Sequence, residues 1–206
     1  MKPILVLYAT REGHTRHLAA HLGVTLGAQR LSSDLVDAAH IPDGFSLTNY
    51  SAAIIAASIH LGKHEREMTK FVKQHVAELE QMPNAFISVS LSEAGAEDQN
   101  ASPDMRAKAR ADVKQMIGAF LAKTGWHPLH VRAVAGALMY RKYNFVVRYA
   151  LKGIARKAGA PTDTSRNYQF TDWAELDRLV VELVQNVSAE MPKSGALGKA
   201  SMSTWL

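Results

Sequence analysis

Apolar, β-rich runs alternate with helical patterns along most of the chain, and this alternation constrains the fold more than any other feature. Strands separated by helices pair in parallel, because each helix carries the chain back across the sheet. The expected strands are Ile4–Tyr8, a weak strand near Ala28–Leu35, Ala52–Ala57, Phe86–Leu91 and Val131–Ala135. The expected helices are Thr15–Leu26, Glu65–Gln81, Pro103–Lys123 and Trp173–Val187. The pattern predicts an α/β fold with a doubly wound, five-stranded parallel sheet.

Two segments lie outside this plan. Residues 140–172 form an insertion between the last strand and the last helix, and residues 188–206 are rich in Gly, Ser and Ala. We therefore expect one domain over residues 1–187, which includes the insertion, followed by a poorly ordered tail over residues 188–206.

The chain contains no cysteine, which excludes disulfide bonds, Cys-ligated zinc, iron–sulfur clusters and thiol catalysis. The apolar run before Thr10 is too short for a signal-peptide core, and no other stretch reaches the roughly 18 apolar residues of a membrane span. We expect a cytoplasmic protein. No carboxylate completes a ligand set with the histidines, so no metal site is predicted.

The positive charge of the chain is concentrated in one region. From Val113 to Thr162 there are nine Lys and Arg and no Asp or Glu. On a helical wheel, residues 141–158 form a basic stripe and a separate apolar stripe, a pattern typical of helices on anionic membrane surfaces. The same stripe could pair with substrate carboxylates, or be the solvated face of an ordinary surface helix. The candidate residues for contact with substrate or membrane are Arg141, Lys142, Tyr143, Arg148, Lys152 and Arg156.

The loop after the first strand has the composition of a phosphate site. It reads Thr10-Arg11-Glu12-Gly13-His14-Thr15 and leads directly into a helix. Backbone N–H groups and the positive end of the helix dipole attract a phosphate, the two Thr hydroxyls add donors, and Gly13 permits close approach. The plain alternative is a helix cap at Thr15 and a turn at Gly13. The chain has neither GxGxxG nor GxxxxGK[ST], so a dinucleotide fingerprint and a P-loop are both absent.

Two further loops follow the third and fourth strands. They begin Ser58-Ile59-His60-Leu61-Gly62 and Ser92-Glu93-Ala94-Gly95. In a doubly wound sheet these loops meet at one edge, near the change in strand order. A flat ring would fit between them, although each loop alone also fits an ordinary strand-to-helix connection.

Taken together, these stretches resemble the flavodoxin-like, menaquinone-dependent protoporphyrinogen oxidase family. The resemblance covers about residues 3–187 and is carried by TREGHT, YSAAIIAASIHLGKHE, MPNAFISVSL, VAGALMY and GAPTDTSRNYQFTDW. It implies a flavodoxin-like fold and noncovalently bound FMN. It also implies oxidation of protoporphyrinogen IX to protoporphyrin IX in haem biosynthesis, with electrons passed to a membrane quinone, menaquinone or ubiquinone. Such an enzyme would be peripherally associated with the inner face of the cell membrane.

The resemblance also implies a set of cofactor-binding residues. The phosphate site would be Thr10, Arg11, Glu12, Gly13, His14 and Thr15. The isoalloxazine ring would be flanked by Ser58, Ile59, His60, Leu61, Gly62, Val89, Ser90, Leu91 and Ser92. Neither ring loop contains the Trp or Tyr that flavodoxins stack on the flavin, so His60 or Leu61 would cover the ring.

Other functions remain open at this stage. Electron-shuttle flavodoxins are strongly acidic, whereas this chain has a pI near 9.5. One alternative is nevertheless an FMN quinone reductase or a flavodoxin-type electron carrier. Another is a non-catalytic membrane or nucleic-acid binding module on the same scaffold. The chain carries no known nucleic-acid reading motif, so no nucleic-acid partner is expected, and no residue is singled out as catalytic.

Overall fold

Five parallel strands form the central sheet. The computed structural model describes residues 2–139 and 163–190. Within these ranges the sheet runs in the order β2-β1-β3-β5-β6, with every neighbouring pair parallel. The strands are β1 Ile4–Ala9, β2 Ser33–Asp37, β3 Ala52–His60, β5 Asn84–Ser90 and β6 His130–Ala135. This order confirms the predicted flavodoxin-like, doubly wound sheet, in which the strand order reverses between β1 and β3.

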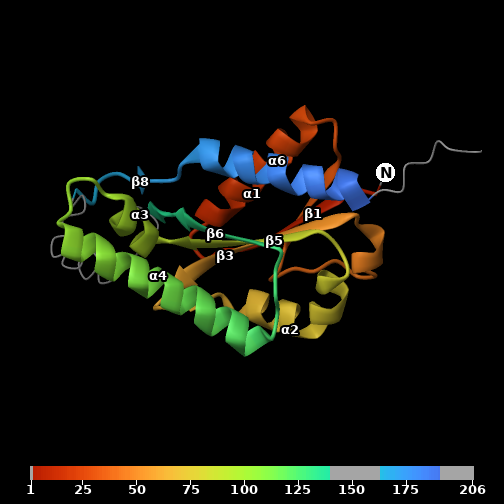
Figure 1. Cartoon of the computed structure of the whole chain (residues 1–206), viewed down its shortest axis with the longest axis horizontal. Helices are drawn as coiled ribbons and strands as arrows, with labels where there is room; N and C mark the ends of the chain where they lie inside the picture. Colours follow the sequence, from red (N-terminus) through yellow and green to blue (C-terminus); the bar gives the residue numbers. More distant parts are fainter. Residues whose placement is uncertain (1, 140–162, 191–206) are drawn as a thin grey trace, which may run out of the picture.

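Helices cover both faces of the sheet (Figure 1). On one face lie α1 (His14–Ala28) and α6 (Trp173–Glu190), and on the other lie α2 (Arg66–Glu80) and α4 (Pro103–Thr124). Two shorter helices, η1 (Leu47–Asn49) and α3 (Leu91–Glu97), complete the helical elements of the described part.

Alternate residues of each strand belong to two separate cores, because successive side chains of a strand point to opposite faces. Val6 packs with α1 and α6, whereas Leu7 packs with α2 and α4. All six residues of β1 are buried, which explains its continuous apolar sequence. The two cores fix the strand ends from which the loops of the candidate site emerge.

The structure corrects the predicted boundaries of two strands. The weak strand lies at Ser33–Asp37 rather than near Ala28–Leu35, because α1 continues to Ala28 and a turn with Arg30 at a φ of 60° follows it. The predicted strand Phe86–Leu91 ends at Ser90, and Leu91 begins α3 where a loop was expected. Ser90 stops the strand because its hydroxyl caps α3, accepting from the backbone N–H of Glu93.

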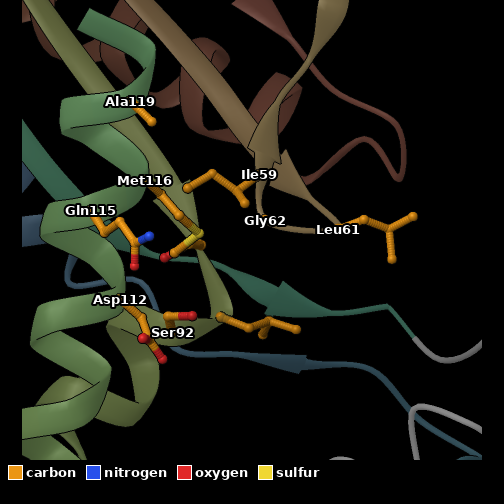
Figure 2. Close-up of a pocket in the computed structure, with 10 residues that line it drawn as sticks. Ile59, Leu61, Gly62, Ser92, Asp112, Gln115, Met116 and Ala119 are labelled. Carbon is orange, nitrogen blue, oxygen red and sulfur yellow. The ribbon is translucent and has the colours of Figure 1, made fainter. Parts of the chain in front are cut away.

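The third strand is longer than predicted and turns back on itself. β3 continues to His60 and pairs antiparallel with β4 (Lys63–His64). The two-residue turn is visible in Figure 2, and both Leu61 and Gly62 have positive φ, 48° and 75°. Two positive values are the signature of a type I′ hairpin turn. The segment predicted as a loop therefore forms a β-hairpin.

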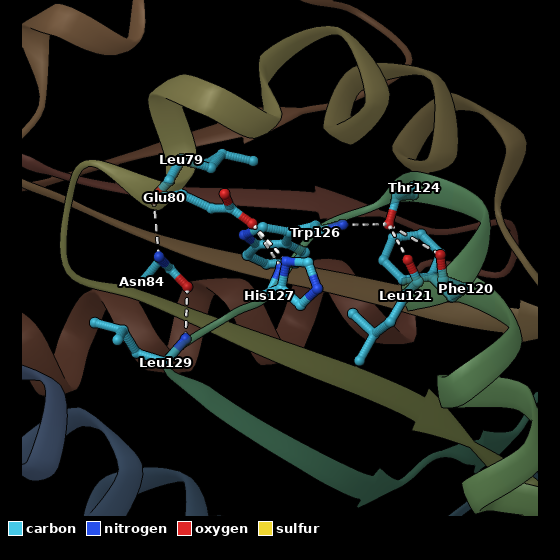
Figure 3. Close-up of polar contacts among 9 residues, drawn as sticks. All are labelled: Leu79, Glu80, Asn84, Phe120, Leu121, Thr124, Trp126, His127 and Leu129. Carbon is cyan, nitrogen blue, oxygen red and sulfur yellow. Dashed lines mark hydrogen bonds and ion pairs between the residues drawn. The ribbon is translucent and has the colours of Figure 1, made fainter.

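At the opposite edge of the sheet, polar contacts fix the starts of β5 and β6 (Figure 3). The Asn84 amide donates to the carbonyl of Leu79 at 2.8 Å, and its oxygen accepts from the N–H of Leu129 at 3.0 Å. The N–H of His127 donates to Glu80 at 2.9 Å. These bonds hold the α2–β5 and α4–β6 connections together, far from the loops at the other edge.

The insertion is described only over residues 163–172, where β8 (Tyr168–Gln169) pairs antiparallel with β7 (Ala137–Leu138). α6 runs to Glu190, three residues beyond the expected end of the domain at residue 187, and residues 191–206 lie outside the described ranges. In the described part, none of the helices has the length and apolar character needed to cross a membrane.

Candidate functional site

The first candidate element is the connection from β1 to α1. Gly13 adopts a φ of 88°, and its N–H donates to the Thr10 hydroxyl at 2.9 Å. No side chain caps α1, so the N–H groups of its first turn face the loop. Thr15 is fully buried, and its hydroxyl has no hydrogen-bond partner in residues 2–139 and 163–190. An uncapped helix start beside a buried, unpaired hydroxyl is suited to an anionic ligand.

Two charged side chains of this loop are already engaged. The Arg11 guanidinium lies 3.2 Å from the Glu65 carboxylate. Oε1 of Glu12 lies 3.6 Å from Nδ1 of His60, a distance too long for a hydrogen bond, and it has no hydrogen-bond partner in the described part of the chain. Because Glu12 is an anion, its backbone rather than its side chain can contact a phosphate. The first pair ties the β1 loop to the start of α2, and the second ties it to the β3–β4 hairpin.

His14 is held as a neutral imidazole. Thr171 Oγ1 donates its only proton to the carbonyl of Ala135 at 2.7 Å, so it must accept from Nε2–H of His14 at 2.8 Å. Nδ1 of His14 is then an acceptor, and it has no partner in the described part of the chain. Burial, helped by the nearby His17, lowers the pKa of His14 to about 4. At neutral pH this side chain can accept a hydrogen bond from a ligand but cannot donate one.

The second candidate element is the β3–β4 hairpin. The Ser58 hydroxyl donates to the Glu65 carboxylate at 3.2 Å, so the side chain of this predicted ring residue is bonded within the protein. Leu61, at the turn, is 89% exposed. A leucine with positive φ is strained by about 1 kcal/mol, and its exposure means that packing within the described residues does not offset this cost. A strained, exposed apolar residue of this kind points to a functional position.

The third candidate element is the junction of β5 and α3. Val89 is buried in the core shared with α1 and α6, and the Ser90 hydroxyl caps α3. Leu91 and Ser92 remain at the surface, where they face the hairpin. Of the four residues predicted here, Leu91 and Ser92 are therefore the two whose side chains remain available for contact with a ligand.

The hairpin, this junction and α4 line an open cavity of about 510 Å³, which we call the ring cavity (Figure 2). It is lined by Ile59, Leu61, Gly62, Ser90, Leu91 and Ser92 from the predicted loops, and by Asp112, Gln115, Met116 and Ala119 of α4. The structure therefore brings the two predicted ring loops together, as expected. The volume of the ring cavity lies in the usual range for a cofactor or ligand site.

Sequence reasoning missed the α4 wall of the ring cavity. The four α4 residues recur at intervals of three, one and three, which places them on one helix face. That periodicity was readable, but nothing local indicated that this face meets a ligand cavity. The Asp112 carboxylate is paired with Lys108 at 3.0 Å, so the wall carries little net charge.

An acidic cluster lies beside α3 and the start of α6. Burial raises the pKa of Glu97 to about 7, and Glu93, Glu175 and Asp172 add to the rise. Burial also raises the pKa of Glu93. These carboxylates repel one another, so the surface beside α3 is poorly suited to an anionic ligand.

The predicted substrate or membrane residues of the insertion lie outside the described residues. These are Arg141, Lys142, Tyr143, Arg148, Lys152 and Arg156. The described end of the insertion contacts the site through Thr171, which bonds His14, and the neighbouring Phe170 N–H donates to the carbonyl of Gly136, just after β6, at 3.1 Å.

Known proteins resemble this chain over most of its length. The flavodoxin domain family matches residues 5–165. A protoporphyrinogen IX dehydrogenase (quinone) from Escherichia coli K12 is 31% identical over 179 residues, 87% of this chain and 93% of the relative. A protein of the same name from Leishmania major is 31% identical over 195 residues, 93% of this chain and 79% of the relative.

A solved short-chain flavodoxin associated with a bacterial microcompartment superposes with a TM-score of 0.54. It is 12% identical and covers 91% of this chain and 99% of its own, which supports the fold alone. A flavodoxin domain implies a flavin cofactor, and the site fits one. The uncapped start of α1 offers a place for an anionic group, and the ring cavity offers a place for a flat ring.

Proposed function

The chain belongs to the flavodoxin domain family and to the quinone-dependent protoporphyrinogen IX dehydrogenases, and we propose that it uses FMN to oxidise protoporphyrinogen IX to protoporphyrin IX with a membrane quinone as acceptor. The observation that carries this proposal is the near-complete overlap with the relatives, 93% of the Escherichia coli protein at 31% identity. The pathway served would be haem biosynthesis.

The β1–α1 connection holds the FMN phosphate in this proposal. The N–H groups at the start of α1 and the Thr15 hydroxyl donate to it, and Gly13 keeps the backbone close. A phosphate monoester has oxygens to accept these bonds, and FAD would need room for a second phosphate. His14 would have a different role, because its Nδ1, which has no partner in the described part, could accept a hydrogen bond from a hydroxyl of the cofactor but not from its phosphate.

The ring cavity holds the isoalloxazine, which supplies the redox chemistry when bound. The chain's own residues would position the ring. The residues that line the cavity include no Trp, Tyr or Phe, so no aromatic side chain of the described part would cover the ring there. Access to the ring suits an enzyme that removes six electrons from one substrate, because substrate and quinone must reach the flavin repeatedly.

We also propose that the protein is cytoplasmic and peripherally bound to the inner face of the membrane. A membrane quinone requires the flavin to approach the bilayer surface, and the acid-free region from Val113 to Thr162 supplies nine cations. Anionic vesicles should bind the protein at low salt, and Arg148→Glu with Lys152→Glu should weaken the binding. Unchanged vesicle binding by this double variant would show that the basic stripe of residues 141–158 does not contact the membrane.

One assay tests the enzymatic proposal against its alternatives. Purified protein is mixed with non-fluorescent protoporphyrinogen IX and a quinone, and porphyrin fluorescence is recorded. An oxidoreductase produces porphyrin only when quinone is present. An electron carrier or quinone reductase is yellow but produces none, and a non-catalytic module is colourless.

A further inference from the structure

A second cavity, of about 610 Å³, adjoins the ring cavity. We call it the basic cavity, because six Lys and Arg side chains from four different segments line it. They are Arg11, Lys63, Arg66, Lys70, Lys73 and Lys123. These residues lie outside the basic insertion that the sequence singled out.

The cations of the basic cavity are almost uncompensated. Glu65 is the one acid that lines it, and its carboxylate already accepts from Arg11 and from Ser58, both at 3.2 Å. The other five cations have no ion pair within residues 2–139 and 163–190. Five unpaired positive charges around one cavity create a strong local attraction for an anion.

The arrangement also acts against the stability of α2. Arg66, Lys70 and Lys73 follow one another at intervals of four and three, so they lie on one helix face and repel each other. Arg66 is the first residue of α2, where the helix dipole disfavours a cation. Residues that destabilise their own helix without a structural benefit are typical of functional sites, where a ligand interacts with them.

Leu61 connects the two cavities. Along the hairpin, Ile59 lines the ring cavity and His60 lines the basic cavity, while Leu61 lines both. A ligand that crosses Leu61 would therefore place an apolar body beside the flavin ring and anionic groups among the cations. The exposed, strained leucine at the turn offers the apolar contact for that body.

We propose that the basic cavity binds the two propionate carboxylates of the porphyrinogen, with its macrocycle across Leu61 towards the ring cavity. This inference rests on the proposed substrate. Arg66 can pair with one carboxylate through two parallel N–H···O bonds, and Lys70 and Lys73 act as point charges for the other. Arg11 stays on Glu65 and sets the boundary with the phosphate loop.

The test compares two double variants of the holoprotein that change the charge equally. Lys70→Glu/Lys73→Glu alters the basic cavity, and Arg30→Glu/Arg178→Glu alters two exposed cations outside both the cavity and the acid-free region. Loss of two carboxylate contacts should raise the KM for protoporphyrinogen at least about tenfold in the first variant, with kcat within about twofold. Flavin content should be unchanged in both, and the second variant should keep the wild-type KM.

A binding titration makes the result independent of activity. Protoporphyrin IX should bind wild-type holoprotein at least about tenfold more tightly than its dimethyl ester, and Lys70→Glu/Lys73→Glu should abolish that preference. Equal binding of diacid and diester by the wild type would overturn the inference. The inference would also be overturned if Lys70→Glu/Lys73→Glu left the KM unchanged but abolished binding to anionic vesicles. The cavity would then bind lipid headgroups rather than the substrate. If diacid preference depends on the cavity but no porphyrinogen is oxidised, the proposed function fails while this binding site stands.

Discussion

His14 Nε2 donates a hydrogen bond to Thr171 Oγ1 over 2.8 Å, joining residues 157 positions apart in the chain. Thr171 in turn donates to the carbonyl of Ala135 at the end of β6. The start of α1, the last sheet strand and the end of the insertion thus meet at one hydroxyl. The insertion is therefore anchored to the helix that we assign to the FMN phosphate.

Removing that hydroxyl should destabilise the protein and weaken FMN binding. Thr171→Val keeps the side-chain shape but leaves Nε2–H of His14 buried without an acceptor, at a cost of about 1–3 kcal/mol. Urea unfolding of the flavin-free protein measures this cost, and flavin fluorescence measures affinity. Thr164→Val, in the same segment, serves as control and should change neither quantity. Equal stability of the two variants would mean that this bond contributes nothing.

Gly13→Val should eliminate most FMN binding. The φ of 88° at Gly13 is unfavourable for a β-branched residue, which would also fill the space beside α1. The control is Gly27→Val, because Gly27 lies in α1 with open space around it and no positive φ. If Gly13→Val bound FMN with wild-type affinity, the phosphate could not be bound by this loop.

Thr15→Val should change stability and affinity in opposite directions. The Thr15 hydroxyl is buried and unpaired in the described part, so replacing it with a methyl group should leave the flavin-free protein as stable as before or more stable. FMN affinity should nevertheless fall about tenfold, because the phosphate loses a donor. Isothermal titration and urea unfolding give the two values. A loss of stability without a loss of affinity would show that the hydroxyl has a structural role only.

Stability of the flavin-free protein should fall as the pH drops from about 6.5 to 4. His64 is buried against Phe86 and Phe120, bonds Ser88, and has its pKa lowered to about 4 by burial. In that window the unfolded state binds a proton that the folded state does not, so acid favours unfolding, by about 3 kcal/mol for His64 alone. His64→Gln should flatten this dependence. Because the pKa of His14 is also lowered to about 4, part of the slope should remain.

The sequence predicted those parts of the site that are contiguous in the chain. The β1 strand, its Thr10–Thr15 connection and α1 form one local unit, so their composition was enough to identify them. The β3–β4 hairpin was not predicted, because Ile59 and His60 extend the strand only by pairing with β4. α3 was missed because a seven-residue helix has little periodicity to read.

The basic cavity escaped prediction for a different reason. Its cations are spread from Arg11 to Lys123 and converge only when α2, β4 and α4 pack together. The spacing of Arg66, Lys70 and Lys73 was visible, but a solvated helix face has the same spacing. The charges of the insertion, by contrast, lie close together in the sequence and are therefore readable there.

The most direct test of the central claim follows the absorption of the bound flavin under anaerobic conditions. Adding protoporphyrinogen IX without quinone should bleach the visible flavin band, and adding menaquinone or ubiquinone should then restore it while porphyrin fluorescence appears. That sequence would place the protein's own flavin between substrate and quinone. A flavin band that protoporphyrinogen leaves unchanged would contradict the account.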